Sequence, residues 1–409
     1  MVVNLLERSL SLILSPSVSR SSGESGGFSL FGSSSASTEV GKQVNSKSAL
    51  KISAFWCGVG AIADAIAILP KNIYEKKGDV RKEKIDHNVG FLIHKEPNLK
   101  MTAYSFWFCM AVCQIVKGNA YALIIRNGAG AITSLKYLHP EDVTVYEDDN
   151  EVFYKIRGGS KKIYFSDEVY HVLGFSYNGV LGMGVLEVAA DNLGISLNAD
   201  KFGGEAYLDR GISHGVLETE KSLNPKGKDN VVKALSRNLD FNNKYKVAVL
   251  DEGMVYKSIS LTPGESGFIE TKASGVEDIA RWLNIPLHKL HSKGEGGYNF
   301  IVQMSIEFLQ SSVMPLAQRM KEEIERKLLS KEEKTTGGLY CYINYKKLLE
   351  VDPTTRAEFY KNMVYIKAMS PNEVRRREDL NPYDGGDEML QMANMLTEAQ
   401  VKKLLKDEK

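Results

Sequence analysis

The sequence predicts an α+β fold in which helices come first, an antiparallel sheet follows, and further helices come after the sheet. Two apolar stretches of helical length, 48–69 and 101–117, precede the strand patterns. Short β-like runs divided by Gly, Asn and Asp turns come next. Apolar residues then recur every fourth position over most of 299–329, which is typical of one long helix. The 409 residues are enough for two or three domains with cores of their own.

The composition is that of an ordinary globular protein. Apolar residues make up 43%, charged residues 25%, and the formal net charge is +1. This balance excludes a strongly basic nucleic-acid binder, so any contact with DNA should be local and weak. The cysteines lack Cys-x-x-Cys spacing. Cys109 and Cys113 are four residues apart, but no nearby second pair of cysteines is present to complete a zinc site with them. Buried thiols in a reducing compartment are therefore predicted at Cys57, Cys109, Cys113 and Cys341.

The first segment, 1–40, is predicted to be a disordered arm, because 15–38 is nearly half serine and offers little to bury. Glu7 and Arg8 interrupt the apolar start, which argues against an export signal. Residues 52–69 approach the length of a membrane span. Asp64 lies inside that stretch, however, and its small residues favour a buried helix of a protein with no membrane contact.

Residues that terminate helices and strands mark the ends of the predicted elements. The helix 48–69 ends at Leu69-Pro70, since proline disfavours the α conformation in the residue before it. A short strand over 71–75 follows, and the aromatic helix 101–117 comes after it. The strand-like runs are 120–126, 132–138, 143–146, 152–156, 162–165 and 169–175.

The stretch 184–210 is again helical and contains Gly203 and Gly204. Glycine disfavours a helix interior, so either the helix breaks near Gly203 or the glycines let a neighbouring helix approach closely. Residues 213–262 form a small βαββ insert, and a helix over 265–283 leads back out. Two helices therefore flank a compact module, as a stalk flanks its tip.

The stretch from Gly275 to Leu329 is the most informative part of the chain. A helix ends at Asn284 and Pro286, a glycine-rich loop covers 292–299, and a helix of roughly 45 Å follows. Pro315 should kink that helix. A flexible loop between two firm helices can touch something that moves past it, which indicates a mechanical part rather than an enzyme pocket.

No catalytic, cofactor or metal site is predicted. The chain has no Gly-x-Ser-x-Gly or His-Glu-x-x-His motif, and Gly182-Met183-Gly184 lacks the remainder of a phosphate-binding loop. His288 and His291 have no carboxylate or thiol at a ligand-like spacing. The acidic run at 147–150 lies between two predicted strands and is interpreted as a turn.

Taken together, these segments resemble the portal proteins of tailed double-stranded DNA bacteriophages, in the family of the long-tailed phages. The resemblance runs from about Asn45 onward and depends on the number, order and spacing of individually weak markers. These are Ser48-Ala49-Leu50, Ala61-Ile62-Ala63, Leu69-Pro70, Glu96-Pro97-Asn98, Gly118-Asn119-Ala120-Tyr121, His171-Val172-Leu173-Gly174-Phe175, Gly179-Val180-Leu181-Gly182, Asp278–Pro286, Pro371-Asn372-Glu373-Val374-Arg375 and Gly385-Gly386-Asp387.

The resemblance implies a portal fold and a ring of subunits, usually twelve, at one capsid vertex. It assigns a wing to 41–180, stem helices to 181–212 and 263–287, and a clip to 213–262. It also assigns a tunnel loop to 288–298, the long kinked helix and return to the wing to 299–350, and a crown to 351–409. Leu287 stands where the family often has a second proline.

A portal of this kind would conduct DNA without sequence preference during packaging and ejection. We expect Lys289, Lys293, Tyr298 and Asn299 to approach the duplex backbone. The alternative is that the loop is only a flexible connector. Arg375, Arg376 and Arg377 either contact DNA inside the head or form a solvated helix face.

The resemblance further implies docking of the terminase large subunit and then a head-completion adaptor at the clip, with major capsid protein and scaffold against wing and crown. The protein would be part of the virion, assembled in the host bacterial cytoplasm, and would not be an enzyme. The competing hypotheses are a phage-encoded DNA-processing enzyme and a membrane-associated scaffold built on 52–69.

Overall fold

The computed structural model describes residues 36–37, 43–148, 151–208, 215–218, 255–258, 268–291, 298–348 and 353–389. Most of the predicted arm 1–40, most of the insert 213–262 and the tail from 390 lie outside the described residues. The predicted insert helix and its middle strand fall in that part.

Two adjacent helices, α3 (Ser53–Ile68) and α5 (Ala103–Val116), supply much of the core. The predicted helix over 48–69 is divided, because Asn45 caps a separate turn, α2 (Ser46–Ala49), in a capping box with Ser48. Ile52 then adopts an extended conformation before α3 begins. In α5, Trp107 is fully buried and its Nε1 donates a 2.8 Å hydrogen bond to the Ile93 carbonyl.

The strands form small antiparallel sheets rather than one large sheet. One has the order β10-β5-β6, a second β7-β8-β9, and a third β13-β3-β4. Their bounds are β3 (Lys71–Lys77), β4 (Val80–Glu83), β5 (Asn119–Arg126), β6 (Ile132–Leu138), β7 (Val143–Asp148), β8 (Glu151–Ile156), β9 (Tyr164–Phe165), β10 (Val169–Leu173) and β13 (Leu339–Ile343). A short pair, β1 (Ala36–Ser37) and β2 (Gln43–Val44), precedes them. All six predicted strands of 120–175 are present, while β4 and the helix α4 (Asn88–His94) were not predicted.

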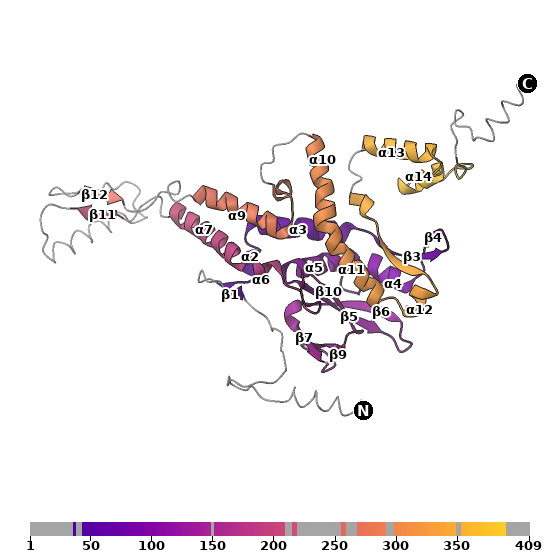
Figure 1. Cartoon of the computed structure of the whole chain (residues 1–409), viewed down its shortest axis with the longest axis horizontal. Helices are drawn as coiled ribbons and strands as arrows, with labels where there is room; N and C mark the ends of the chain where they lie inside the picture. The colour runs from indigo at the N-terminus through magenta and orange to yellow at the C-terminus, as the bar shows by residue number, and fades with distance from the viewer. Residues whose placement is uncertain are drawn as a thin grey trace, which may run out of the picture.

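Two helices leave the body side by side. After one turn, α6 (Val185–Val188), the helix α7 (Ala190–Leu208) packs along α9 (Phe268–Leu283). Figure 1 shows this pair leading outward to the paired strands β11 (Gly215–Glu218) and β12 (Val255–Ser258). The helix α7 is not broken at Gly203. The close approach of the two helices is at Gly275, where a Cβ would lie 2.9 Å from Ser196 Oγ, whereas Gly204 faces open space.

The long helical segment has three parts. The helix α10 (Tyr298–Glu307) runs into a π-helical segment, η3 (Phe308–Val313), and then into α11 (Met314–Lys327). Pro315 lies in the first turn of α11, directly after the π-helical segment. Figure 1 shows α11 lying over the sheet that contains β10 and β5. A short helix, α12 (Lys331–Thr335), links α11 to β13.

The last described helices, α13 (Pro353–Tyr365) and α14 (Pro371–Arg377), lie beside each other away from the α7–α9 pair (Figure 1). Ser370 and Glu373 form a capping box at the start of α14, and Pro371 occupies its first turn. Across the described parts of the chain, no helix has the length and apolarity needed to cross a bilayer.

Candidate functional site

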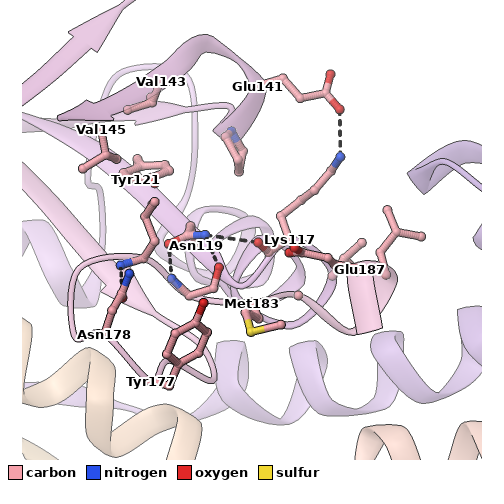
Figure 2. A pocket seen from close by; sticks show the side chains of 16 residues that line it. Lys117, Asn119, Tyr121, Glu141, Val143, Val145, Tyr177, Asn178, Met183 and Glu187 are labelled. Atoms are coloured by element: carbon pink, nitrogen blue, oxygen red, sulfur yellow. Dashed lines mark hydrogen bonds and ion pairs between the residues drawn. The ribbon is translucent and has the colours of Figure 1, made fainter. Parts of the chain in front are cut away.

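The helices α7 and α9 together are called the α7–α9 arm from here on. Three of the marker segments meet where the sheet ends and this arm begins. They are 118–121 at the end of α5, 171–175 on β10, and 179–182 just before α6. Figure 2 shows this place, with Asn119 at its centre and Tyr177, Asn178 and Met183 around it. We call it the glycine junction.

Glycines allow the backbones at the junction to touch. A Cβ on Gly182 would lie 1.9 Å from the Gly118 carbonyl oxygen, and a Cβ on Gly184 would lie 2.2 Å from the Val116 carbonyl oxygen. Gly118 has a φ of +73°, a conformation that side-chain-bearing residues rarely adopt. The Gly174 amide donates a 2.6 Å hydrogen bond to the Gly118 carbonyl. Any side chain at these positions would push the segments apart.

The side chain of Asn119 joins the first segment to the third. Its Nδ2 donates to the Gly182 carbonyl at 2.7 Å, and its Oδ1 accepts from the Gly182 amide at 2.9 Å. Since an amide N–H can only donate and a carbonyl can only accept, these two bonds fix the orientation of the amide group. Asn119 therefore holds the start of the arm in one register relative to β5.

His171 locks Asn119 in turn. Its Nε2 lies 3.0 Å from Asn119 Oδ1, and its Nδ1 lies 3.1 Å from the Tyr154 hydroxyl. Burial lowers the pKa of His171 to about 3, so the ring is neutral at physiological pH. Because Asn119 Oδ1 can only accept, Nε2–H donates to it and Nδ1 accepts from Tyr154. The ring also stacks on Tyr121 with centroids 4.3 Å apart.

The long helix is tied to the same place. Arg319 of α11 donates from its guanidinium to the Gly174 carbonyl. The next residue of α11 is Met320, and its carbonyl accepts a 2.9 Å hydrogen bond from the Tyr170 hydroxyl. Gln114 of α5 donates to the Leu173 carbonyl at 2.9 Å. The junction thus connects β5, β10, the arm and α11.

Beside the junction lies a cavity of about 200 Å³. Its rim carries the ion pair of Lys117 Nζ with Glu141 Oε1 at 3.0 Å, and the lysine lowers the pKa of the Glu141 carboxyl (Figure 2). Glu187, Tyr177, Asn178 and Asn119 are further polar residues of the lining. Nothing in this set forms a nucleophile–base pair. Within the described ranges, no group of three or more His, Cys, Asp or Glu side chains is placed to hold a metal ion. The junction is suited to fixing an angle between parts rather than to chemistry.

Three of the four residues predicted to contact DNA lie elsewhere, in the elements directly before and after the loop. Lys289 belongs to the 3₁₀ helix η2 (Leu287–Leu290), is half-buried, and places Nζ 5.3 Å from the centroid of the Phe308 ring. Tyr298 and Asn299 begin α10. Lys293 lies outside the described residues. Leu287, at the position of the missing second proline, begins η2.

The three crown arginines differ in their surroundings. Arg375 Nε donates to the Asn381 carbonyl at 2.7 Å, and its guanidinium lies 5.7 Å from the centroid of the Tyr383 ring. Arg376 pairs with Asp387 at 3.2 Å. Arg377 is exposed. Arg375 and Arg376 therefore already interact with other residues of the C-terminal segment.

Comparison with known proteins places this architecture among relatives. The model of the family described as phage portal protein matches residues 53–379, which include the whole junction. The portal protein of Enterobacteria phage HK97 is 28% identical over 360 residues, covering 86% of this chain and 84% of the relative. A probable portal protein of Streptomyces phage phiC31 is 24% identical over 365 residues, covering 85% and 78%.

Solved structures share the fold. An HK97-family phage portal protein from Corynebacterium diphtheriae superposes with a TM-score of 0.58 at 15% identity, covering 76% of this chain and 98% of that one. A chain from the neck of a native gene transfer agent particle, computed with C12 symmetry, gives a TM-score of 0.54 at 17% identity, covering 82% and 93%.

Proposed function

The chain belongs to the phage portal protein family, and from this premise we propose that its copies form a ring at one capsid vertex, through which DNA is packaged and later ejected. The main support is the family match over 53–379. The structural match to a chain from the neck of a gene transfer agent particle, computed with C12 symmetry, supports a ring of twelve copies, and the match to a chain of the virion supports its place in the particle.

The arrangement of the parts suits this role. A sheet-and-helix body carries a two-helix arm, and the glycine junction fixes the angle between them. In the ring, the body would be the wing (41–180 with the long helix and return, 299–350), and the arm would be the stem (181–212 and 263–287). The clip (213–262) would stand at the outer end of the arm, where β11 and β12 lie in Figure 1. The crown (351–409) would follow the long helix.

The conduit is proposed to act without catalysis. A ring multiplies any attraction of one subunit for phosphate, so a strongly basic lumen would hold DNA back, and a net charge of +1 per chain suits free passage. Lys289, Lys293, Tyr298 and Asn299 would approach the duplex backbone from the tunnel loop (288–298). They would restrain DNA without reading its sequence.

The partners follow from the same proposal. The clip would dock the terminase large subunit during packaging and the head-completion adaptor afterwards. Wing and crown would contact the major capsid protein and scaffold, and the ring would be assembled in the host cytoplasm. Deleting 221–243 should leave rings that form but bind neither terminase nor adaptor. Normal docking by the deleted form would show that the clip is placed elsewhere.

The decisive experiment is single-particle imaging of the purified 409-residue chain, with mass photometry in parallel. Rings with an axial hole support the proposal, and solid or solitary particles contradict it. Assays for DNA cleavage, ATP turnover and proteolysis test the competing enzyme hypothesis. A robust activity that one point substitution abolishes would favour the enzyme.

A further inference from the structure

One face of α3 and α5 is open to solvent although both helices are apolar on nearly all sides. The helix α5 contains no charged residue, and α3 contains only Asp64. A helix that is hydrophobic all round is normally covered all round. Trp56, however, is 64% exposed, Ile68 47% and Tyr104 45%. Single exposed apolar side chains are common, but a row across adjoining helices indicates an interaction surface.

The exposed residues of α3 lie in one row with the half-buried Gly60. Trp56, Gly60, Asp64 and Ile68 are spaced four apart, so they lie along one side of α3. The Tyr104 hydroxyl of α5 donates to Asp64 Oδ1, which joins the second helix to this row and occupies its only carboxylate. The Tyr104 ring stacks on Phe108, with centroids 6.4 Å apart. We call these six residues the α3–α5 face.

Gly60 is an independent sign that something approaches this face. Glycine in a helix interior is less favourable than alanine. Gly58 has a reason within the chain, because a Cβ there would lie 2.4 Å from Leu283 Cδ1 of α9. A Cβ on Gly60 would meet no atom within 4 Å. The missing side chain at Gly60 therefore makes room for no other group in the described part of the chain. It leaves a small gap in the α3–α5 face, here called the notch, which a partner packed on the face would fill.

We propose that a second copy of this chain covers the α3–α5 face, as one side of the contact between neighbouring subunits. The inference rests on the proposed function, since in a ring each subunit has a copy on both flanks. The charges argue against DNA as the occupant and are compatible with a second copy. The face offers no cation to a DNA phosphate, and its one carboxylate is already bonded. Copies with 52 basic and 51 acidic residues have almost no net charge with which to repel one another.

Gly60→Leu separates assembly from folding. Leucine is a better helix former than glycine and meets open space in the single chain, so the melting temperature of the unassembled chain should stay the same or rise. The added side chain fills the notch, so ring formation should require at least about tenfold more protein. Ala357→Leu, at an exposed position of α13, is the matched control and should assemble as the wild type does.

A second pair of variants tests the apolar row. Trp56→Glu should abolish rings while the chain stays folded. The control is Ile85→Glu, at another exposed apolar residue, and this variant should still form rings. All variants are measured as the 409-residue chain by mass photometry and thermal melting. A wild type that never forms rings would overturn both the ring and this face. Wild-type rings with undiminished assembly of Gly60→Leu and Trp56→Glu would overturn the face alone. Variants that form rings but fail to enter capsids would assign the face to a capsid protein and refute a second copy.

Discussion

The side chain of Asn284 donates a 3.0 Å hydrogen bond from Nδ2 to the backbone carbonyl of Ser311. That carbonyl lies four residues before Pro315, so in a regular α-helix its donor would be the N–H that proline lacks. The Ser312 hydroxyl donates back to the Asn284 carbonyl. Asn284, directly after α9, thus gives the Ser311 carbonyl the hydrogen bond that Pro315 cannot donate. The π-helical segment η3 lies directly before the turn that contains this proline. Asn284 itself has a φ of 51°, which asparagine tolerates better than most residues.

Replacing Asn284 tests this pairing. Asn284→Gly keeps the backbone conformation but loses the donor, so we expect a loss of about 1 kcal/mol in the free energy of unfolding. Asn284→Ala loses the donor and also strains the backbone, so its loss should be larger by about 1 kcal/mol. Denaturant unfolding of the three proteins measures both steps. Equal stabilities of Asn284→Gly and the wild type would show that the bond contributes nothing.

Gly182→Ala should disrupt the glycine junction. The new methyl group would lie 1.9 Å from the Gly118 carbonyl oxygen, which is backbone and cannot swing aside. We expect a loss of about 3 kcal/mol or more in the free energy of unfolding. Gly128→Ala is the control, because a Cβ there would meet nothing within 4 Å and its φ is not positive. Similar stabilities of the two variants would show that the segments are not held in close contact.

The helices and most strands could be predicted because their apolar periodicity and their Pro and Gly boundaries are local. The strand β4 could not, since all four of its residues, Val80–Glu83, are exposed and no apolar alternation marks them. The seven residues of α4 are too few to show a helical period. The division of α2 from α3 depends on the Asn45 cap, which a continuous apolar pattern conceals.

The junction could be predicted only in part. The segments around Asn119, His171 and Gly182 were recognised as markers, but their meeting depends on hydrogen bonds between residues 52 and 63 positions apart. No local pattern signals the contact of Arg319 with Gly174 across 145 positions. An irregularity of the long helix near Pro315 can be predicted from the proline alone. Its π-helical form involves the hydrogen bond from Asn284 to Ser311, and these residues are 27 positions apart.

The neutral histidine of the junction predicts sensitivity to acid. The pKa of His171 is about 3 in the folded chain and near 6.5 when unfolded, so the unfolded chain binds more protons between these values. Stability should therefore fall as pH is lowered from about 6.5 towards 3. The wild type should lose more stability over this range than His171→Gln, in unfolding measured at pH steps. His94→Gln, at an exposed histidine, should retain the wild-type slope. Parallel curves for the wild type and His171→Gln would mean that His171 is already charged in the fold.

The double variant Lys293→Ala and Tyr298→Ala tests the proposed tunnel loop. If the loop restrains DNA through phosphate contacts, its attraction is repeated in every subunit, so a small loss per chain becomes a large loss per ring. Heads assembled with the variant should therefore lose packaged DNA several-fold faster than wild-type heads. The difference should shrink as salt is raised, because salt already weakens phosphate contacts in the wild type. Lys331→Ala, which removes an exposed lysine from α12, is the control and should leave retention unchanged. Packaged length and retention are read from DNase-protected DNA. Retention equal to that of the control would reduce the loop to a connector between η2 and α10.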